Sequence, residues 1–293
     1  MAEHNVTVES TLTALMENRK YAAVKDMLVT MNPADIASIF DELDEDKIPL
    51  MFRLLPKSLA ADTFVEMESE HQEMLIRGFS DKELGEVVDE LNVDDAADLA
   101  DEMPANVVSR ILAQASPEKR REINEILRYP ENSAGSIMTT EFVSLRVDMT
   151  VAEAIQRIRL TGVDKETIYT CYVTENRHLL GILSVKDLLL TLDDNKRVGE
   201  IMDTNVISVN TLTDQEEVAH RLSKYNFIAL PVVDTENRMV GIVTFDDAMD
   251  VIEEETTEDI EIMGGMTPSE KPYLRSSPVE LFKHRIPWLM LLM

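Results

Sequence analysis

The sequence predicts an α plus α/β fold, in which a superhelical solenoid of short helices precedes a tandem pair of β-α-β-β-α units and a C-terminal linker helix. Three observations predict it. Apolar residues recur every twelve positions in the first 130 residues. One pattern occurs twice, as GILSVKDLLL at 181–190 and GIVTFDDAMD at 241–250. The second copy runs into an acidic stretch, and the chain ends in a short apolar tail. At 293 residues, the chain is long enough for two domains and a remainder.

Residues 1–130 are predicted to be a helical-repeat domain. One apolar position recurs at intervals of twelve, namely Phe40, Phe52, Phe64, Ile76, Val88, Ala100 and Leu112. Asn32 and Ser116 each stand before a proline, as helix-capping residues do. Ser80 and Glu83 have the spacing of a capping box. Helices of about two turns are too short to be stable alone, so stacking must hold them.

Residues 133–196 and 197–255 are predicted to be two copies of one unit. Each copy opens with Ile-Met, at 137 and 201, and continues through apolar strands to the Gly-initiated strand. A hydroxyl residue then precedes a helix with Asp in its first turn. The order of elements and the motifs IMxT, ALPVVD and GIVTxxD resemble a tandem pair of CBS domains. That resemblance implies an adenosine nucleotide between the copies, with Asp187 and Asp247, preceded by Ser184 and Thr244, on the ribose. The alternative is that both Asp residues only cap helices. Asp187 is the better nucleotide ligand, because Asp247 lies in the acidic stretch.

The acidic stretch predicts a helix with a charged face. Nine of the sixteen residues from 246 to 261 are acidic and none is basic. Asp247, Asp250, Glu254 and Glu258 recur at helical spacing, and like charges so placed repel. Packing this face against Asp94, Asp98, Asp214 or Glu216 would require a cation. Carboxylates without His or Cys suit hard cations such as Mg²⁺ or Ca²⁺. The alternative is a plain solvated face.

The charge of the chain restricts its partners. The net charge of −28 argues against nucleic acid as a partner. Residues 1–130 carry 28 acids and 13 bases, a net of −15, whereas residues 263–293 carry 2 acids and 4 bases, a net of +2. Cys171 is the only cysteine, so no internal disulfide forms, and residues 1–20 lack the apolar core of a signal peptide.

The C-terminal tail ends in the apolar run IPWLMLLM. Eight residues cannot span a bilayer, which needs about 20. A Trp beside a Lys-His-Arg flank is nevertheless typical of a membrane helix entered from the cytoplasmic side. We expect an acidic linker helix at 256–283 and the start of a first transmembrane helix at 284–293. The alternative is a short C-terminal core helix.

The whole order resembles the cytosolic portion of an MgtE-type magnesium transporter. The resemblance rests on LNVDDAAD (91–98), YPENSAGSIMT (129–139), TLTDQEEVA (211–219) and the stretch 241–260. It implies a homodimer formed through the CBS domains, on the cytoplasmic side of the cell membrane, joined to its own transmembrane domain. At high intracellular Mg²⁺ the domains would close together, and the linker, or plug, helix would hold the pore shut.

The resemblance also implies two sets of site residues. The sensing ligands would be Asp62, Asp94, Asp98, Asp214, Glu216, Asp247, Asp250, Glu255, Glu258 and Asp259. Asn226 stands where the family can present an Asp, and its amide oxygen would ligate without charge. The site for ATP or another adenosine nucleotide would comprise Tyr169, Lys186, Asp187, Phe227 and Asp246.

Two other classes of function compete with cation sensing. In the first, the chain is a nucleotide-sensing interaction module whose acidic surface serves only solubility. In the second, it is an enzyme regulated by the CBS pair. The sequence disfavours an enzyme, because its five histidines are scattered and it has neither a Walker-type loop nor a nucleophile elbow.

Overall fold

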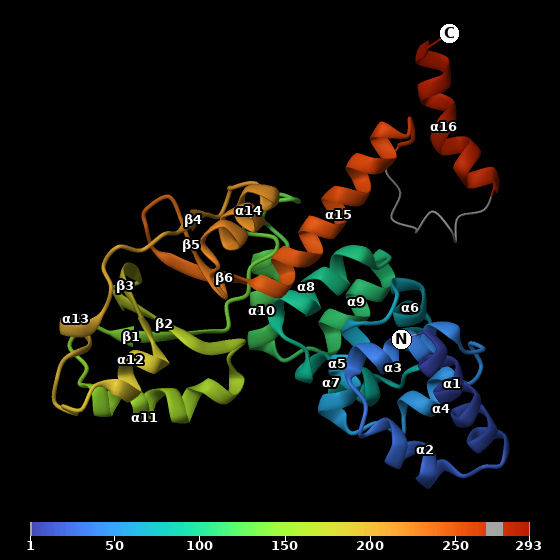
Figure 1. Cartoon of the computed structure of the whole chain (residues 1–293), viewed down its shortest axis with the longest axis horizontal. Helices are drawn as coiled ribbons and strands as arrows, with labels where there is room; N and C mark the ends of the chain where they lie inside the picture. Colours follow the sequence, from blue (N-terminus) through green and yellow to red (C-terminus); the bar gives the residue numbers. More distant parts are fainter. Residues whose placement is uncertain (1, 268–277, 293) are drawn as a thin grey trace. The chain divides into compact units, whose positions relative to one another are not determined.

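The computed structural model describes residues 2–267 and 278–292. The chain divides into two compact units, Met1–Arg128 and Tyr129–Met293. Figure 1 shows helices alone in the first unit and both helices and strands in the second. The predicted fold class is confirmed. The two units are described separately below.

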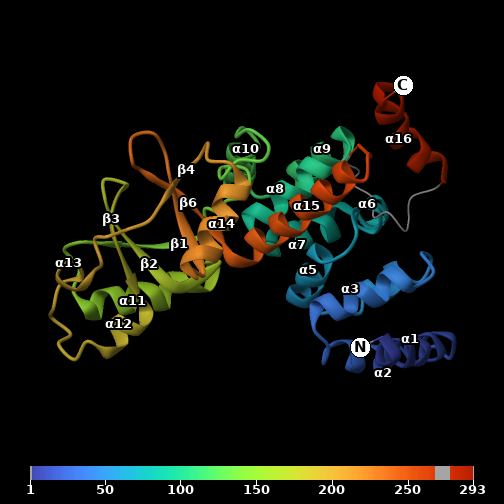
Figure 2. The same ribbon diagram turned by 45° about the horizontal axis from the view of Figure 1, so that its top comes forward.

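The first unit consists, over its described residues, of ten helices that follow one another closely. They are α1 (Ala2–Glu17), α2 (Tyr21–Leu28), α3 (Pro33–Glu42), α4 (Ile48–Phe52), α5 (Lys57–Val65), α6 (Ser69–Gly78), α7 (Asp81–Glu90), α8 (Val93–Glu102), α9 (Ala105–Gln114) and α10 (Pro117–Ile126). Helices two apart pack together: α5 contacts α3 and α7, α7 contacts α9, and α8 contacts α10 (Figure 2). Stacking on second neighbours produces the superhelix.

The twelve-residue period sets where these helices begin. The first residues of α5 to α10 lie at 57, 69, 81, 93, 105 and 117, twelve apart. Among α2 to α10, only α4 departs from this phase, because it begins at Ile48 and not at 45. A turn over residues 45–47 delays it, with Lys47 Nζ 2.7 Å from Asp44 Oδ2. Pro49 then lies in the first turn of α4, where its missing N–H costs nothing.

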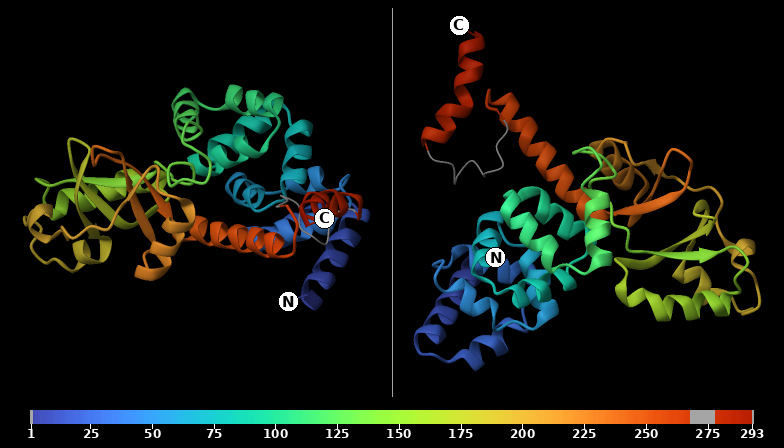
Figure 3. Two further views of the ribbon diagram at one scale, coloured as in Figure 1. Left: turned by 90° about the horizontal axis from the view of Figure 1, so that it is seen from above. Right: turned by 180° about the vertical axis from the view of Figure 1, so that it is seen from behind.

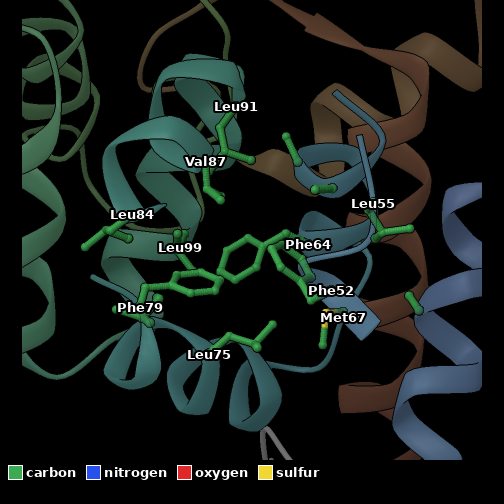
Figure 4. Close-up of a cluster of buried hydrophobic side chains, with 14 of the residues drawn as sticks. Phe52, Leu55, Phe64, Met67, Leu75, Phe79, Leu84, Val87, Leu91 and Leu99 are labelled. Atoms are coloured by element: carbon green, nitrogen blue, oxygen red, sulfur yellow. The ribbon is translucent and has the colours of Figure 1, made fainter. Parts of the chain in front are cut away.

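Phenylalanines from three helix ends pack together at the centre of the first unit (Figure 4). The ring centroids of Phe52 and Phe79 are 5.4 Å apart, and those of Phe52 and Phe64 are 6.1 Å apart with the rings edge to face. All three side chains are buried. Such pairs contribute about 0.5–1.5 kcal/mol beyond area burial. The apolar positions of the repeat are therefore the core of this unit.

The second unit contains two three-stranded sheets with the same topology. The first sheet comprises β1 (Phe142–Arg146), β2 (Thr167–Glu175) and β3 (His178–Ser184); the second comprises β4 (Val209–Asn210), β5 (Ala229–Val233) and β6 (Met239–Thr244). In each sheet the first two strands are parallel and the last two antiparallel. The helices are α11 (Val151–Thr161), α12 (Val185–Leu190), α13 (Val198–Ile201), α14 (Gln215–Tyr225) and the 3-10 turn η1 (Gly162–Asp164). The predicted β-α-β-β-α order is confirmed in both copies.

The opening motif of each copy packs on the sheet of the other copy. Ile182 exchanges backbone hydrogen bonds with Asp203, and Ile242 does so with Thr139. The glycine before each isoleucine permits this approach. A Cβ on Gly181 would lie 2.8 Å from the Asp203 carbonyl oxygen, and one on Gly241 would lie 2.7 Å from that of Thr139. The two copies therefore interlock, which the order of motifs along the chain did not reveal.

The chain leaves the second sheet through one continuous helix, α15 (Phe245–Met263), which follows β6 directly (Figure 3). This helix runs through the predicted boundary between residues 255 and 256. Part of the predicted linker helix, 268–277, lies outside the described residues. A further helix, α16 (Pro278–Leu292), contains Pro287 and the start of the apolar tail. Among the described helices, none is both long and apolar enough to cross a membrane.

Candidate functional site

The hydroxyl residue and the Asp of each repeated motif meet at the start of a helix. In the first copy, Ser184 Oγ accepts a hydrogen bond from the Asp187 backbone N–H at 3.1 Å and donates to Asp187 Oδ2 at 2.5 Å. In the second copy, the Thr244 hydroxyl donates to Asp247 Oδ2 in the same way. Both carboxylates therefore serve as part of helix caps. The capping role predicted as the alternative is present, and it leaves one carboxylate oxygen of Asp187 outside this contact.

The residues predicted to bind nucleotide fall into two groups, one in each copy. Lys186 and Asp187 are exposed in the first turn of α12, which packs on β2 and β3. Tyr169 lies in β2, one residue before Thr170, the register partner of Ser184, and is 67% exposed. An aromatic face, a cation and a carboxylate are therefore close to one strand end.

The second group lies at the start of α15. The Phe245 backbone N–H donates to the Ile228 carbonyl at 2.9 Å, which brings the segment after α14 beside Asp246. Phe227 is half-buried and stacks on Tyr225, with ring centroids 5.5 Å apart. Asp246 is exposed. The structure thus repeats in the second copy the pairing of an aromatic residue with a helix-start carboxylate.

Helices α14 and α15 pack together and bring predicted cation ligands from both helices to one place. Asp214 caps α14, and its Oδ1 accepts from the Glu216 backbone N–H at 3.0 Å. Gln215, between them, is buried and donates from Nε2 to Glu255 Oε1 at 3.0 Å. The carboxylates of Asp214, Glu216 and Glu255 therefore belong to one acidic region at the start of α14.

The carboxylates of α15 differ in their exposure. Asp247 and Glu255 are half-buried, whereas Asp250, Glu258 and Asp259 are exposed. Partial desolvation raises the pKa of Asp250, and the negative charges of Asp246 and Glu253 raise it further. Burial and, to a lesser extent, the neighbouring acids therefore disfavour the charged form of Asp250. Glu261, which the sequence analysis did not single out, is buried on the same helix.

Asn226 ends α14 in the left-handed conformation, with φ 53° and ψ 43°. Asn adopts this region more readily than other residues except glycine, so the amide fits the helix end. Its side chain is exposed. The backbone conformation provides a structural reason for Asn at this position, separate from its predicted role as a ligand.

The first unit carries the three remaining predicted ligands on α5 and α8. Asp94 lies in the first turn of α8 and is 5% exposed, which is unusual for a carboxylate. Asp98 follows one turn later and is exposed. Asp62 on α5 is also exposed; partial desolvation raises its pKa, and the negative charge of Glu90 adds to this. The same kind of carboxylate crowding therefore occurs in this unit.

The predicted ligands offer oxygen donors only, which is the donor set that Mg²⁺ accepts in proteins. Within residues 2–267 and 278–292, no three of them lie within 4.8 Å of one another. Mg²⁺ keeps several water ligands and needs only one or two carboxylates. The chemistry of the residues therefore fits loosely held Mg²⁺ and does not form a dedicated protein cage.

Comparisons with known proteins cover both units. The family described as the MgtE intracellular N domain matches residues 31–132, and the CBS domain family matches residues 134–194 and 198–254. The magnesium transporter MgtE of Thermus thermophilus is 39% identical over 275 residues, which are 92% of this chain and 61% of that protein. MgtE of Bacillus subtilis is 31% identical over 284 residues, 95% of this chain and 61% of its own. The chain thus spans about three fifths of these relatives.

Two solved structures resemble the whole arrangement of elements. The crystal structure of the cytosolic domain of the Mg²⁺ channel MgtE in complex with ATP has a TM-score of 0.78 and 38% identity, covering 83% of this chain and 99% of that one. The soluble part of a magnesium transporter has a TM-score of 0.77 and 30% identity, covering 87% and 99%. Both similarities extend over the helical unit and the duplicated unit.

Proposed function

Because this chain belongs to the MgtE family of magnesium transporters, we propose that it is a regulatory region that senses intracellular Mg²⁺ and closes the pore when the ion is abundant. The chain is not an enzyme; its relatives are transporters. Full-length relatives are named as magnesium transporters, and this chain covers 61% of their length. The proposal concerns what the carboxylates of the two units do when the ion binds.

The observation that carries the proposal is the crowding of carboxylates on α14 and α15. Asp250 is held in an environment that raises its pKa, and Gln215 fixes Glu255 beside the acidic start of α14. When no cation is present, mutual repulsion keeps these carboxylates apart. A divalent cation bound there replaces repulsion with attraction. In this proposal, Mg²⁺ binding is therefore coupled to the position of the helices that carry the other carboxylate ligands.

In this proposal, the carboxylates of the first unit that share the cation are those of Asp62, Asp94 and Asp98. The surroundings of Asp62 favour cation binding for the same reason, since desolvation and, to a lesser extent, the negative charge of Glu90 raise its pKa. In the proposed mechanism Mg²⁺ holds the two units together, and loss of Mg²⁺ releases them. The linker at 256–283, whose described parts include the end of α15 and the start of α16, transmits this change to the pore. Asn226 contributes a neutral ligand, together with Asp214, Glu216, Asp247, Glu258 and Asp259.

The experiment compares the Mg²⁺-dependent rise in thermal stability of the wild type with that of Asp247→Asn combined with Glu258→Gln. We expect the double variant to lose most of the rise. A matched control, Glu118→Gln with Glu175→Gln, removes two exposed charges away from α14 and α15 and should keep it. Equal Mg²⁺ responses in the double variant and the wild type would refute the assignment of these ligands.

The second candidate function is the binding of ATP or another adenosine nucleotide by the CBS pair. It is favoured by the exposed Tyr169, Lys186 and Asp187 around one strand end and by the relative whose structure contains ATP. Asp187 would hold the ribose hydroxyls, with Phe227 and Asp246 in the equivalent place of the second copy. ATP should stabilise the wild type but not Asp187→Asn. Glu175→Gln, which removes an exposed carboxylate at the far end of β2, should retain the ATP response; an unchanged response in Asp187→Asn would rule out its role.

The proposed assembly is a homodimer formed through the CBS domains. Both copies expose large apolar side chains, including Leu160 (72%), Leu189 (64%) and Leu190 (67%) on helices of the first copy and Ile228 (56%) just before β5 in the second. Apolar groups of this size in exposed clusters are typical of protein interfaces. Sedimentation at rising protein concentration should show a dimer, and Leu189→Glu should weaken it.

The proposed location is the cytoplasmic face of the cell membrane, with the first transmembrane helix starting at residue 284, within α16. Lys283 and Arg285 precede Trp288 on that helix. Basic residues followed by an aromatic residue and an apolar run are typical of a cytoplasmic membrane entry. In the full-length protein, the cysteine of a Lys283→Cys variant should not be labelled by a thiol reagent that is added outside the cell and cannot cross the membrane.

A further inference from the structure

A histidine and two carboxylates lie close together in the first unit, among residues that the magnesium proposal does not use. His71 Nδ1 is 2.7 Å from Asp41 Oδ1. Ligand atoms of Asp41, Glu68 and His71 all lie within 4.8 Å of one another, and all three residues are half-buried. Asp41 belongs to α3, Glu68 is the N-cap residue of α6 and His71 lies in its first turn. The group therefore joins two helices about thirty residues apart in sequence.

The side chains of Asp41 and His71 lie where water screens charge poorly. Asp41 is the penultimate residue of α3, where the helix dipole already presents negative partial charge. Its side chain is 14% exposed and that of His71 is 15% exposed, so water screens them poorly. Carboxylate oxygens and an imidazole nitrogen are all metal ligands. A divalent cation can bind all three side chains at once, whereas a proton on the ring links only two.

The donor set selects a class of cation. One imidazole nitrogen with two carboxylate oxygens suits Zn²⁺ and similar first-row ions, and it leaves a fourth position for water. Mg²⁺ prefers oxygen ligands only, as on α14 and α15. We propose that Asp41, Glu68 and His71 form a binding site for a divalent transition-metal ion that is separate from the Mg²⁺-sensing carboxylates.

Binding requires only a small rearrangement of the group. Metal–ligand bonds of about 2.0–2.1 Å place two ligands of a tetrahedral ion about 3.3 Å apart. With Nδ1 as the ligand, the ion replaces the proton of the Asp41–His71 hydrogen bond and these atoms separate slightly from 2.7 Å. The bound ion then fastens α3 to the start of α6. Because it competes with a proton, its affinity falls as the pH is lowered.

The test uses Co²⁺, whose visible absorption reports both nitrogen coordination and geometry, on the whole chain in excess Mg²⁺. The excess Mg²⁺ occupies carboxylate-only sites, so the remaining Co²⁺ signal reports this site. We expect one Co²⁺ per chain, displaced by Zn²⁺, and a Zn²⁺-dependent rise in melting temperature of roughly 5 °C or more. His71→Gln and Glu68→Gln should each weaken Co²⁺ binding about tenfold or more.

The control variant is His220→Gln, because His220 is exposed on α14 and should not affect the signal. Circular dichroism confirms that each variant remains folded, and Glu68→Gln provides a second test should His71→Gln unfold the helices. Absence of a Co²⁺ band in the wild type would overturn the proposal. So would His71→Gln and Glu68→Gln variants that bind Co²⁺ with the same affinity as the wild type. These results are independent of the Mg²⁺ response, so this site and the sensing function can fail separately.

Discussion

Gln215 Nε2 donates a hydrogen bond to Glu255 Oε1 at 3.0 Å and so joins α14 to the acidic helix α15. Gln215 is buried, and it lies between the capping residue Asp214 and Glu216. A neutral donor thus holds one predicted ligand beside two others without neutralising any of them. The acidic region is positioned before a cation arrives, which lowers the cost of ordering these side chains on binding.

Replacing Gln215 with Leu should test this positioning. The substitution keeps the approximate volume but removes the donor, so we expect a loss of about 1 kcal/mol in the free energy of unfolding without Mg²⁺. It should also reduce the further gain that Mg²⁺ provides. Urea denaturation in EDTA and in Mg²⁺ measures both quantities. The matched control is Gln72→Leu, which removes an equally buried amide that donates to the Phe64 carbonyl at 2.8 Å. The prediction fails if both variants lose the Mg²⁺ gain alike.

Asp250→Asn should stabilise the protein when Mg²⁺ is absent. The folded protein raises the pKa of Asp250 above its ordinary value of 3.8, so the charged carboxylate destabilises the fold at neutral pH. This cost disappears as the pH falls through the raised pKa towards 3.8. The urea midpoint of Asp250→Asn in EDTA should therefore exceed that of the wild type at pH 7, and the difference should shrink at pH 4. A difference independent of pH would show that the raised pKa of Asp250 is not its cause.

Gly241→Ala should disrupt the interlocked copies. The new Cβ would lie 2.7 Å from the Thr139 carbonyl oxygen, and a backbone atom cannot move aside cheaply. We expect a loss of about 1–3 kcal/mol, and Gly181→Ala should behave in the same way. Gly78→Ala is the control, because nothing lies within 4 Å of its added Cβ at the end of α6. That change should be neutral or slightly stabilising. Chemical denaturation that found all three variants equal would refute the close approach.

The fold could be predicted largely because its two units have internal periods. The twelve-residue period sets the starts of α5 to α10, since every buried position recurs on the same helical face. It fails at α4, where a local turn around Asp44 and Pro49 overrides the period. The interlocking of Gly181 with Asp203 could not be predicted, because the repeat of a motif does not reveal which copy it packs on.

The candidate site could be predicted only in part. Helical spacing indicates which carboxylates of α15 share a face, and capping-box spacing indicates the Thr244–Asp247 pair. The contact of Gln215 with Glu255 joins residues forty positions apart, and no local pattern encodes it. His71 was dismissed as one of five scattered histidines, because its neighbours Asp41 and Glu68 come together only through the stacking of helices. The left-handed backbone conformation at the end of α14 explains why an Asn occupies position 226, and composition alone could not reveal this.

The central claim is that Mg²⁺ binds these carboxylates and changes the arrangement of the chain. The most direct measurement is thermal unfolding with limited proteolysis of the wild-type chain across a Mg²⁺ titration at fixed ionic strength, with K⁺ as the matched salt. The account predicts a rise in melting temperature in the millimolar range, of order several degrees, and protection of α15 from cleavage with Mg²⁺ only. The same stability and the same cleavage of α15 in both salts would contradict it.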